Sequence, residues 1–195
     1  PIFNVFMDKL YMILLCLMIV PILICIKYSR KIKSDVASSI VKCLIFAIVT
    51  ILSNGLSAFS GNETFSYIME ALYRFSFDLM LIYVLQYSQQ YTRVFHEVSP
   101  FKKGCFIIAY LDGILLFLNI IFHNVFTIET VRFPNFDMYH VADKSIIFYF
   151  HYVFAYGLVV CIIASFIIKI IQIPDFYRKK YLPILVLICV ITVRS

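Results

Sequence analysis

The stretch that decides the fold reads YIMEALYRFSFDLMLIY and covers residues 67–83. It is apolar enough for a membrane interior, yet it carries Glu70, Arg74 and Asp78. These residues are four apart each time, and an α-helix turns once per about 3.6 residues, so all three project from one face. A charge near the bilayer centre costs from ~2.5 kcal/mol on insertion scales to more than ~10 kcal/mol in simulations. We therefore expect this face to point into a helix bundle, where Arg74 can pair with either carboxylate.

The composition places the whole chain in a lipid bilayer. Of the 195 residues, 63% are hydrophobic and 14% charged, and the mean hydropathy is +0.93. Soluble domains are about half apolar and a quarter charged. The net charge of +6 does not indicate a nucleic-acid partner, because the basic residues lie in short segments between apolar runs. The six cysteines form no C-x-x-C pair and have no histidine at ligand spacing, so we expect no disulfide, metal or cofactor.

Apolar runs of about 20 residues, the length that spans a bilayer as a helix, recur along the chain. They predict an all-α polytopic transmembrane bundle with six spans, at residues 6–26, 37–59, 65–92, 104–126, 145–169 and from Tyr181 to Val193. The sixth run has only 13 residues, so we expect it to be truncated. We therefore interpret residues 1–195 as a single domain, a fragment of a longer protein with a seventh helix.

The basic residues between the runs predict the orientation. Segments 27–35, 93–103 and 169–180 hold four, three and four Lys or Arg, whereas 60–66 holds none and 127–144 holds two. Because Lys and Arg accumulate on the cytoplasmic side, we expect the N-terminus outside. Segment 127–144 is then an external loop that either caps the bundle or covers a site.

A second polar face follows from the spacing in the fourth run. Asp112, Asn119 and His123 are separated by seven and four residues, which returns them to one side of a helix. His151 in the fifth run lies among tyrosines, and we interpret that edge as an interface anchor. The expected ligand-sensing cavity is lined by Glu70, Arg74, Asp78, Asp112, Asn119 and His123. The alternative is that these residues only hold the helices together.

Two longer stretches carry a family resemblance: YIMEALYRFSFDLMLIYVLQYSQQYTR (67–93) and PDFYRKKYLPILVLI (174–188). Together with the expected external N-terminus and the basic first loop, they resemble the seven-transmembrane sensory domain at the N-terminus of bacterial histidine kinases and GGDEF-type diguanylate cyclases. The resemblance covers most of the chain. A recurring Glu of the family's third helix corresponds to Glu70, and its Tyr/Arg segment before the sixth helix corresponds to Tyr177, Arg178 and Tyr181.

The resemblance implies a receptor domain in the inner membrane of a bacterium. It implies that a small ligand or a membrane signal acts on the bundle and that an attached cytoplasmic domain responds. A homodimer is also compatible with the resemblance. The output favoured is a diguanylate cyclase making cyclic di-GMP, with a histidine kinase second. No G-x-x-x-x-G-K, G-x-G-x-x-G or H-E-x-x-H motif occurs, so no catalytic site is expected within these residues.

Two other functions remain open from the sequence. A small-solute transporter or carrier subunit also places charges at mid-membrane depth, although the chain shows no internal repeat and has only five glycines. A structural membrane subunit is the third possibility, and there the charges serve only to pair with one another.

The orientation is testable by cysteine labelling. Ser34→Cys and Ser99→Cys, each in a cysteine-free background, should resist a membrane-impermeant maleimide in intact cells and react after lysis. Labelling of either cysteine from outside an intact cell would reverse the assignment.

Overall fold

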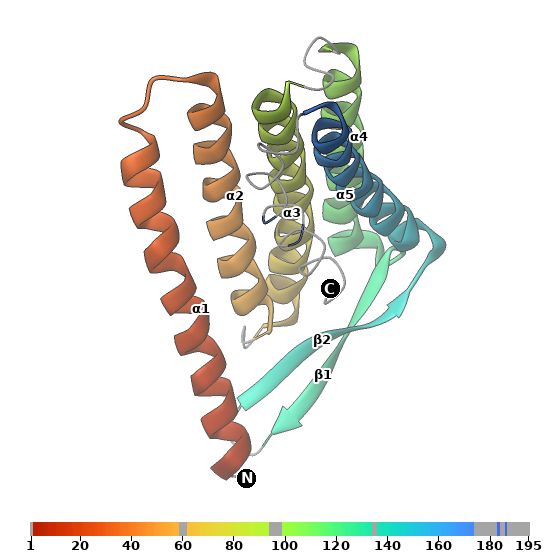
Figure 1. Cartoon of the computed structure of the whole chain (residues 1–195). Coiled ribbons are helices and arrows are strands. Elements are labelled where there is room, and N and C mark those ends of the chain that lie inside the picture. The colour runs from red at the N-terminus through yellow and green to blue at the C-terminus, as the bar shows by residue number, and fades with distance from the viewer. Residues whose placement is uncertain are drawn as a thin grey trace.

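The computed structural model describes residues 2–58, 62–93, 99–133 and 136–173, together with residues 183 and 186. Up to residue 173, the described residues form five helices and two strands in chain order (Figure 1). They are α1 (Ile2–Ser29), α2 (Asp35–Ala58), α3 (Glu63–Thr92), α4 (Ser99–Phe122), β1 (Phe126–Phe133), β2 (Phe136–Lys144) and α5 (Ile146–Gln172). The helices run alternately up and down, which confirms the predicted helical bundle.

The number of spans that the described residues support is smaller than predicted. Three helical segments are long and apolar enough to cross a membrane: Asp35–Ser57, Pro100–Phe122 and Ile146–Gln172. A shorter apolar segment, Ile13–Ser29, accompanies them. All of the expected sixth span except Pro183 and Val186 lies outside the described residues, as do Tyr177, Arg178 and Tyr181. Six spans are therefore not found in the part of the chain that the structure describes.

Helix α3 is the centre of the bundle. It packs against α2, α4, α5 and β1, whereas α1 packs against α2. The outer helices expose large apolar side chains such as Ile107 of α4 and Val153 of α5, as lipid-facing helices do. Most of the charged side chains of α3 are instead covered by its neighbours. This central position explains why α3 carries more polar residues than the three apolar helices around it.

A close approach between α3 and α4 occurs at Gly113. A Cβ atom at this position would lie 2.5 Å from Cδ2 of Phe75 in α3. Glycine therefore lets the Phe75 ring lie directly against the α4 backbone. This approach brings the neighbouring residue, Asp112, toward α3.

The segment at 127–144 is a β-hairpin, which corrects its prediction as a loop. β1 and β2 pair antiparallel, with Phe126 opposite Lys144 and Phe133 opposite Phe136. The two runs flanking Pro134-Asn135 are rich in aromatic and β-branched residues, the composition of strands. In the hydropathy profile this signal is hidden by the apolar helices on either side.

The base of the hairpin is packed into the bundle. Phe126 is 1% exposed and lies in an apolar cluster with Tyr67 of α3, Leu116 of α4 and Phe148 of α5. From this base the strands extend across the end of the bundle (Figure 1). The hairpin therefore caps that end by direct packing on three helices.

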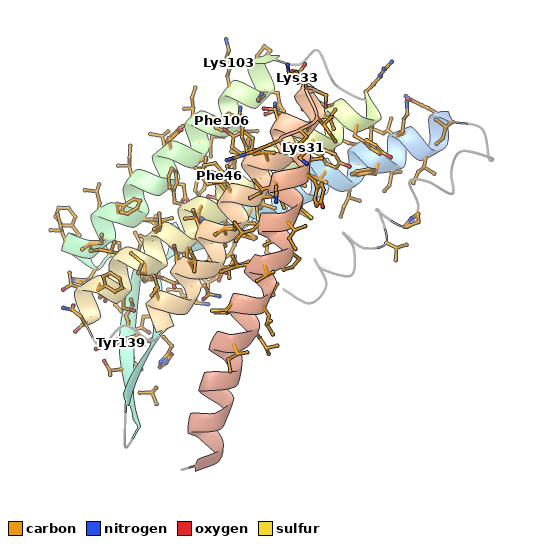
Figure 2. All side chains as sticks on the ribbon, turned by 90° about the vertical axis from the view of Figure 1, so that its left-hand side faces the viewer. Lys31, Lys33, Phe46, Lys103, Phe106 and Tyr139 are labelled. Carbon is orange, nitrogen blue, oxygen red and sulfur yellow. The ribbon has the colours of Figure 1, made fainter. Side chains whose placement is uncertain are left out.

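Basic side chains lie at one end of the bundle, opposite the hairpin. Lys31, Lys33 and Lys103 lie at one end, and Tyr139 of the hairpin lies at the other (Figure 2). The basic connections 27–35 and 93–103 were predicted to share one side of the membrane. The placement of these three lysines agrees with that arrangement, and which side is cytoplasmic stays a prediction.

Candidate functional site

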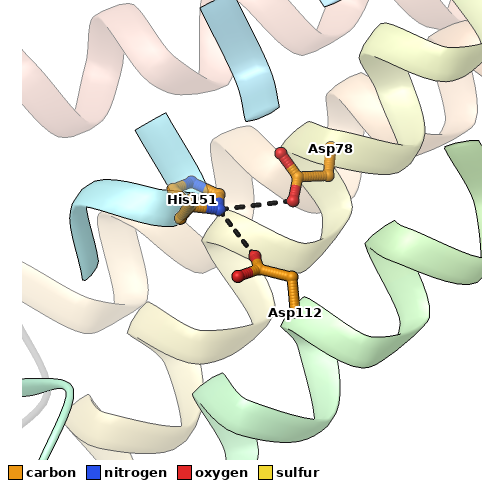
Figure 3. Close-up of side chains that lie close together, drawn as sticks. All are labelled: Asp78, Asp112 and His151. Carbon is orange, nitrogen blue, oxygen red and sulfur yellow. Dashed lines mark hydrogen bonds and ion pairs between the residues drawn. The ribbon is translucent and has the colours of Figure 1, made fainter. Parts of the chain in front are cut away.

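Three ionisable side chains meet inside the bundle, one from each of three helices. Asp78 of α3, Asp112 of α4 and His151 of α5 are 0%, 2% and 3% exposed. His151 Nδ1 lies 2.8 Å from Asp112 Oδ2 and 3.2 Å from Asp78 Oδ2 (Figure 3). We call these three residues the Asp–His cluster.

Ionisable residues are rare in the apolar parts of α4 and α5. Asp112 is the only Asp, Glu, Lys, Arg or His between Lys103 and Phe122, and His151 is the only one between Ile146 and Ile168. Each apolar helix thus carries one such residue in its membrane-length core, and both point at Asp78. Ionisable residues within apolar helices are costly and usually mark a function.

The hydrogen bonds within the cluster are unevenly shared. His151 Nδ1 is at hydrogen-bonding distance and geometry to Asp112 Oδ2. It is within ion-pair distance of Asp78 Oδ2, but both Asp78 carboxyl oxygens lack a hydrogen-bond partner among the described residues. One ring nitrogen carries at most one hydrogen, so it can satisfy only one carboxylate at a time. Asp78 is therefore the under-satisfied member of the cluster.

The other two charges of the α3 face form a separate group. Arg74 pairs with Glu70 one turn earlier on the same helix, and the Ser57 hydroxyl of α2 donates to Glu70 Oε2 at 3.1 Å. The Arg74 guanidinium carbon lies 4.3 Å from the ring centroid of Phe148 on α5. Its cation is stabilised by the aromatic face as well as by the carboxylate.

The predicted face with Glu70, Arg74 and Asp78 is thus divided into two groups. Arg74 was expected to pair with either carboxylate of α3, and the structure pairs it with Glu70. Asp78 lies one turn further along and faces His151 instead. The Glu70–Arg74 pair ties α3 to α2 and α5, whereas Asp78 belongs to the Asp–His cluster.

Asn119 and His123, which were predicted to line the cavity, do not join the Asp–His cluster. Asn119 Nδ2 donates to the Phe126 carbonyl at 2.8 Å, and its Oδ1 accepts from the Val125 amide at 2.7 Å. His123 is exposed and takes a left-handed backbone conformation, with φ of 49°, directly after α4 ends. Its ring lies edge-on to Tyr67, with centroids 4.6 Å apart. Both residues shape the connection from α4 to the hairpin.

His151 is the residue that sequence reasoning placed at an interface and the structure places in the cluster. The sequence indicated its importance only in that His151 is the single Asp, Glu, Lys, Arg or His between Ile146 and Ile168. Nothing in the spacing along one helix could show that it meets Asp78 and Asp112 from two other helices.

Two apolar hollows on the described surface lie elsewhere. One is lined by Phe75, Tyr110, Gly113, Ile114, Phe117 and Leu118, and the other by Ile13, Cys16, Leu17 and Val20. Neither includes a residue of the Asp–His cluster. The three side chains of the cluster lie against one another at the contact of three helices and are at most 3% exposed.

No protein-family model, curated protein sequence or solved structure matches the chain.

The Glu70–Arg74 pair generates a stability prediction. Arg74→Ala should lower the free energy of unfolding in detergent by about 3–5 kcal/mol, the usual cost of stranding one partner of a buried pair. Adding Glu70→Gln should recover part of the loss, because no charge is then stranded. Adding Asp78→Asn instead should change the free energy of unfolding only by the amount that Asp78→Asn changes it in the unaltered protein, since Asp78 is not the partner of Arg74. A coupling of Arg74 to Asp78 as large as its coupling to Glu70 would contradict this pairing.

Proposed function

We propose that this chain is a membrane-embedded signal-sensing domain, and that the Asp–His cluster is its responsive element. The observation that carries the proposal is that one buried, charge-unbalanced cluster connects α3, α4 and α5. Two carboxylates face one imidazole, so adding or removing a single positive charge changes the attraction among all three helices.

The energy of such a change is of the size that switching requires. At 3.2 Å, the distance between His151 Nδ1 and Asp78 Oδ2, one pair of unit charges interacts by about 5 kcal/mol at an effective dielectric constant of ~20. Moving a two-state equilibrium from 1:99 to 99:1 takes about 5.5 kcal/mol. One charge gained or lost in the cluster is therefore enough to change which helix packing is favoured.

Helix α5 provides a route from the cluster to the basic end of the bundle. It follows β2 directly, carries His151 in its second turn, and carries Lys169 in its last turn. A helix of 27 residues is about 40 Å long. A shift at His151 therefore displaces the far end of α5, where the sequence pattern predicts the cytoplasm.

The proposed output is an attached cytoplasmic enzyme. In this proposal α3 crosses the membrane inside a ring of apolar helices, the N-terminus is outside a bacterial inner membrane, and a seventh helix leads into the output domain. The resemblance of residues 67–93 and 174–188 to the sensory domains of diguanylate cyclases and histidine kinases supports this assignment. A cyclase that makes cyclic di-GMP is the favoured output.

The second candidate function is a small-solute transporter coupled to a proton or cation. The same cluster favours it, because buried acidic and histidine side chains form the relays of many carriers. The two functions differ in their readout: a sensor changes the activity of an enzyme, whereas a carrier moves solute across a sealed membrane.

The test compares two histidine substitutions in the protein with its native C-terminal continuation. In inverted membrane vesicles, His151→Gln should change the rate of cyclic di-GMP synthesis by a factor within the ~5–150-fold range of allosteric couplings. His123→Gln is the matched control, because His123 lies outside the cluster, and its rate should equal that of the unaltered protein.

Two results would contradict the sensing proposal. One is an unchanged rate of cyclic di-GMP synthesis and of autophosphorylation in a His151→Gln protein that is present at normal level. The other is solute uptake driven by a proton or cation gradient in the same vesicles, abolished by His151→Gln.

A further inference from the structure

We infer that Asp78, Asp112 and His151 form a binding site for one divalent transition-metal ion. The inference deepens the proposed function, because it names the class of ligand to which the same cluster responds. Metal binding by the cluster can nevertheless be measured without any signalling readout.

The spacing of the ligand atoms fits a metal centre. One ligand atom from each of the three side chains lies within 4.8 Å of the other two, and His151 Nδ1 is 2.8 Å and 3.2 Å from the two carboxylate oxygens. Zinc binds nitrogen and oxygen at about 2.0–2.2 Å, so a tetrahedral site places its ligand atoms about 3.4 Å apart. Relative to that spacing of about 3.4 Å, the two histidine contacts would lengthen by about 0.6 and 0.2 Å, and the two carboxylate oxygens, which lie within 4.8 Å of each other, would approach by at most about 1.4 Å.

The charge of the cluster calls for a divalent cation. In the form that binds a metal, with both carboxylates ionised and the imidazole neutral, the three side chains carry a charge of −2 in a site that is at most 3% exposed. Burying an uncompensated charge is strongly unfavourable. In the described part of the chain the ion pairs of Asp78 and Asp112 are with His151 alone, and Arg74 is engaged by Glu70. One M²⁺ ion brings the net charge of the three side chains to zero.

The carboxylate of Asp78, which has no hydrogen-bond partner among the described residues, favours a metal ion over a proton on His151 as the species that the cluster binds. A proton on His151 Nδ1 can point to Asp112 or to Asp78, and the hydrogen-bond geometry selects Asp112. Asp78 is fully buried, and its carboxyl has no hydrogen-bond partner among the described residues although one oxygen is 3.2 Å from the imidazole nitrogen. A metal ion has no such limit, because it accepts lone pairs from all three side chains at once.

The donor set narrows the choice of ion. Carboxylate oxygens with one imidazole suit Zn²⁺ or Mn²⁺, whereas Ca²⁺ and Mg²⁺ prefer oxygen alone and Cu⁺ prefers sulfur. The cysteine spacing led to the expectation of no metal site, and this proposal departs from it, because that spacing bears only on thiolate ligands. Three protein ligands also leave a coordination position for water or an anion, as in zinc sites that are not purely structural.

The experiment uses the purified chain in detergent after removal of metal with a chelator. Isothermal titration with Zn²⁺ should show one ion bound per chain, and Zn²⁺ should raise the thermal unfolding midpoint. Co²⁺ should give the visible absorption bands of a tetrahedral nitrogen–oxygen site. Asp78→Asn and His151→Gln should each weaken Zn²⁺ binding by more than ~100-fold, above the ~10–100-fold cost of losing an outer-shell partner.

The matched controls are His123→Gln and His140→Gln, since both side chains are exposed. They should retain the affinity and the Co²⁺ spectrum of the unaltered chain. Asp78→Asn supplies a second readout that a purely structural role does not predict. It should raise the unfolding midpoint of the metal-free protein, because it removes an unpaired buried charge, and it should abolish the additional rise caused by Zn²⁺.

The metal proposal is overturned if neither Zn²⁺ nor Mn²⁺ binds the metal-free chain. It is equally overturned if Asp78→Asn and His151→Gln leave Zn²⁺ binding unaffected, or if His123→Gln or His140→Gln abolishes it. Failure of the metal proposal leaves the His151→Gln effect on enzyme output to be measured separately, so the two proposals fail independently.

Discussion

Charges in a bundle whose outer surface is apolar have to be balanced inside it, and this constraint organises the molecule around α3. This helix carries Glu70, Arg74 and Asp78 and is covered by α2, α4 and α5. Glu70 and Arg74 satisfy each other, with Ser57 and the Phe148 ring completing their surroundings. Asp78 has no such partner on its own helix, so its balance depends on side chains that α4 and α5 bring to it.

The arrangement of the surrounding elements follows from that requirement. Gly113 lets Phe75 approach the α4 backbone, which places Asp112 near Asp78. Asn119 joins the end of α4 to β1, and Phe126 fixes the base of the hairpin among three helices. The hairpin leads directly into α5 and sets the position at which His151 enters the bundle. The Asp–His cluster is thus held by three helices whose relative positions are each determined by separate contacts.

The sequence predicted those features that depend on one helix at a time. The four-residue spacing placed Glu70, Arg74 and Asp78 on one face, and the face does point inward. The contacts of Asn119 and His123 were not predictable in this way, because α4 was expected to continue to residue 126 and ends at Phe122. His123 therefore leaves the helical register. The partnership of His151 with two aspartates depends on packing between helices that lie far apart in sequence, and no spacing encodes it.

A double-mutant cycle measures the central claim, that residues from different helices form one interacting site. The free energy of unfolding in detergent would be compared for Asp112→Asn, His151→Gln and the double variant, and again with His123→Gln in place of His151→Gln. The structure predicts a coupling of about 1–3 kcal/mol between Asp112 and His151. It predicts additivity within about 0.5 kcal/mol for Asp112 and His123. Additivity for Asp112 and His151, or a larger coupling to His123, would contradict the account.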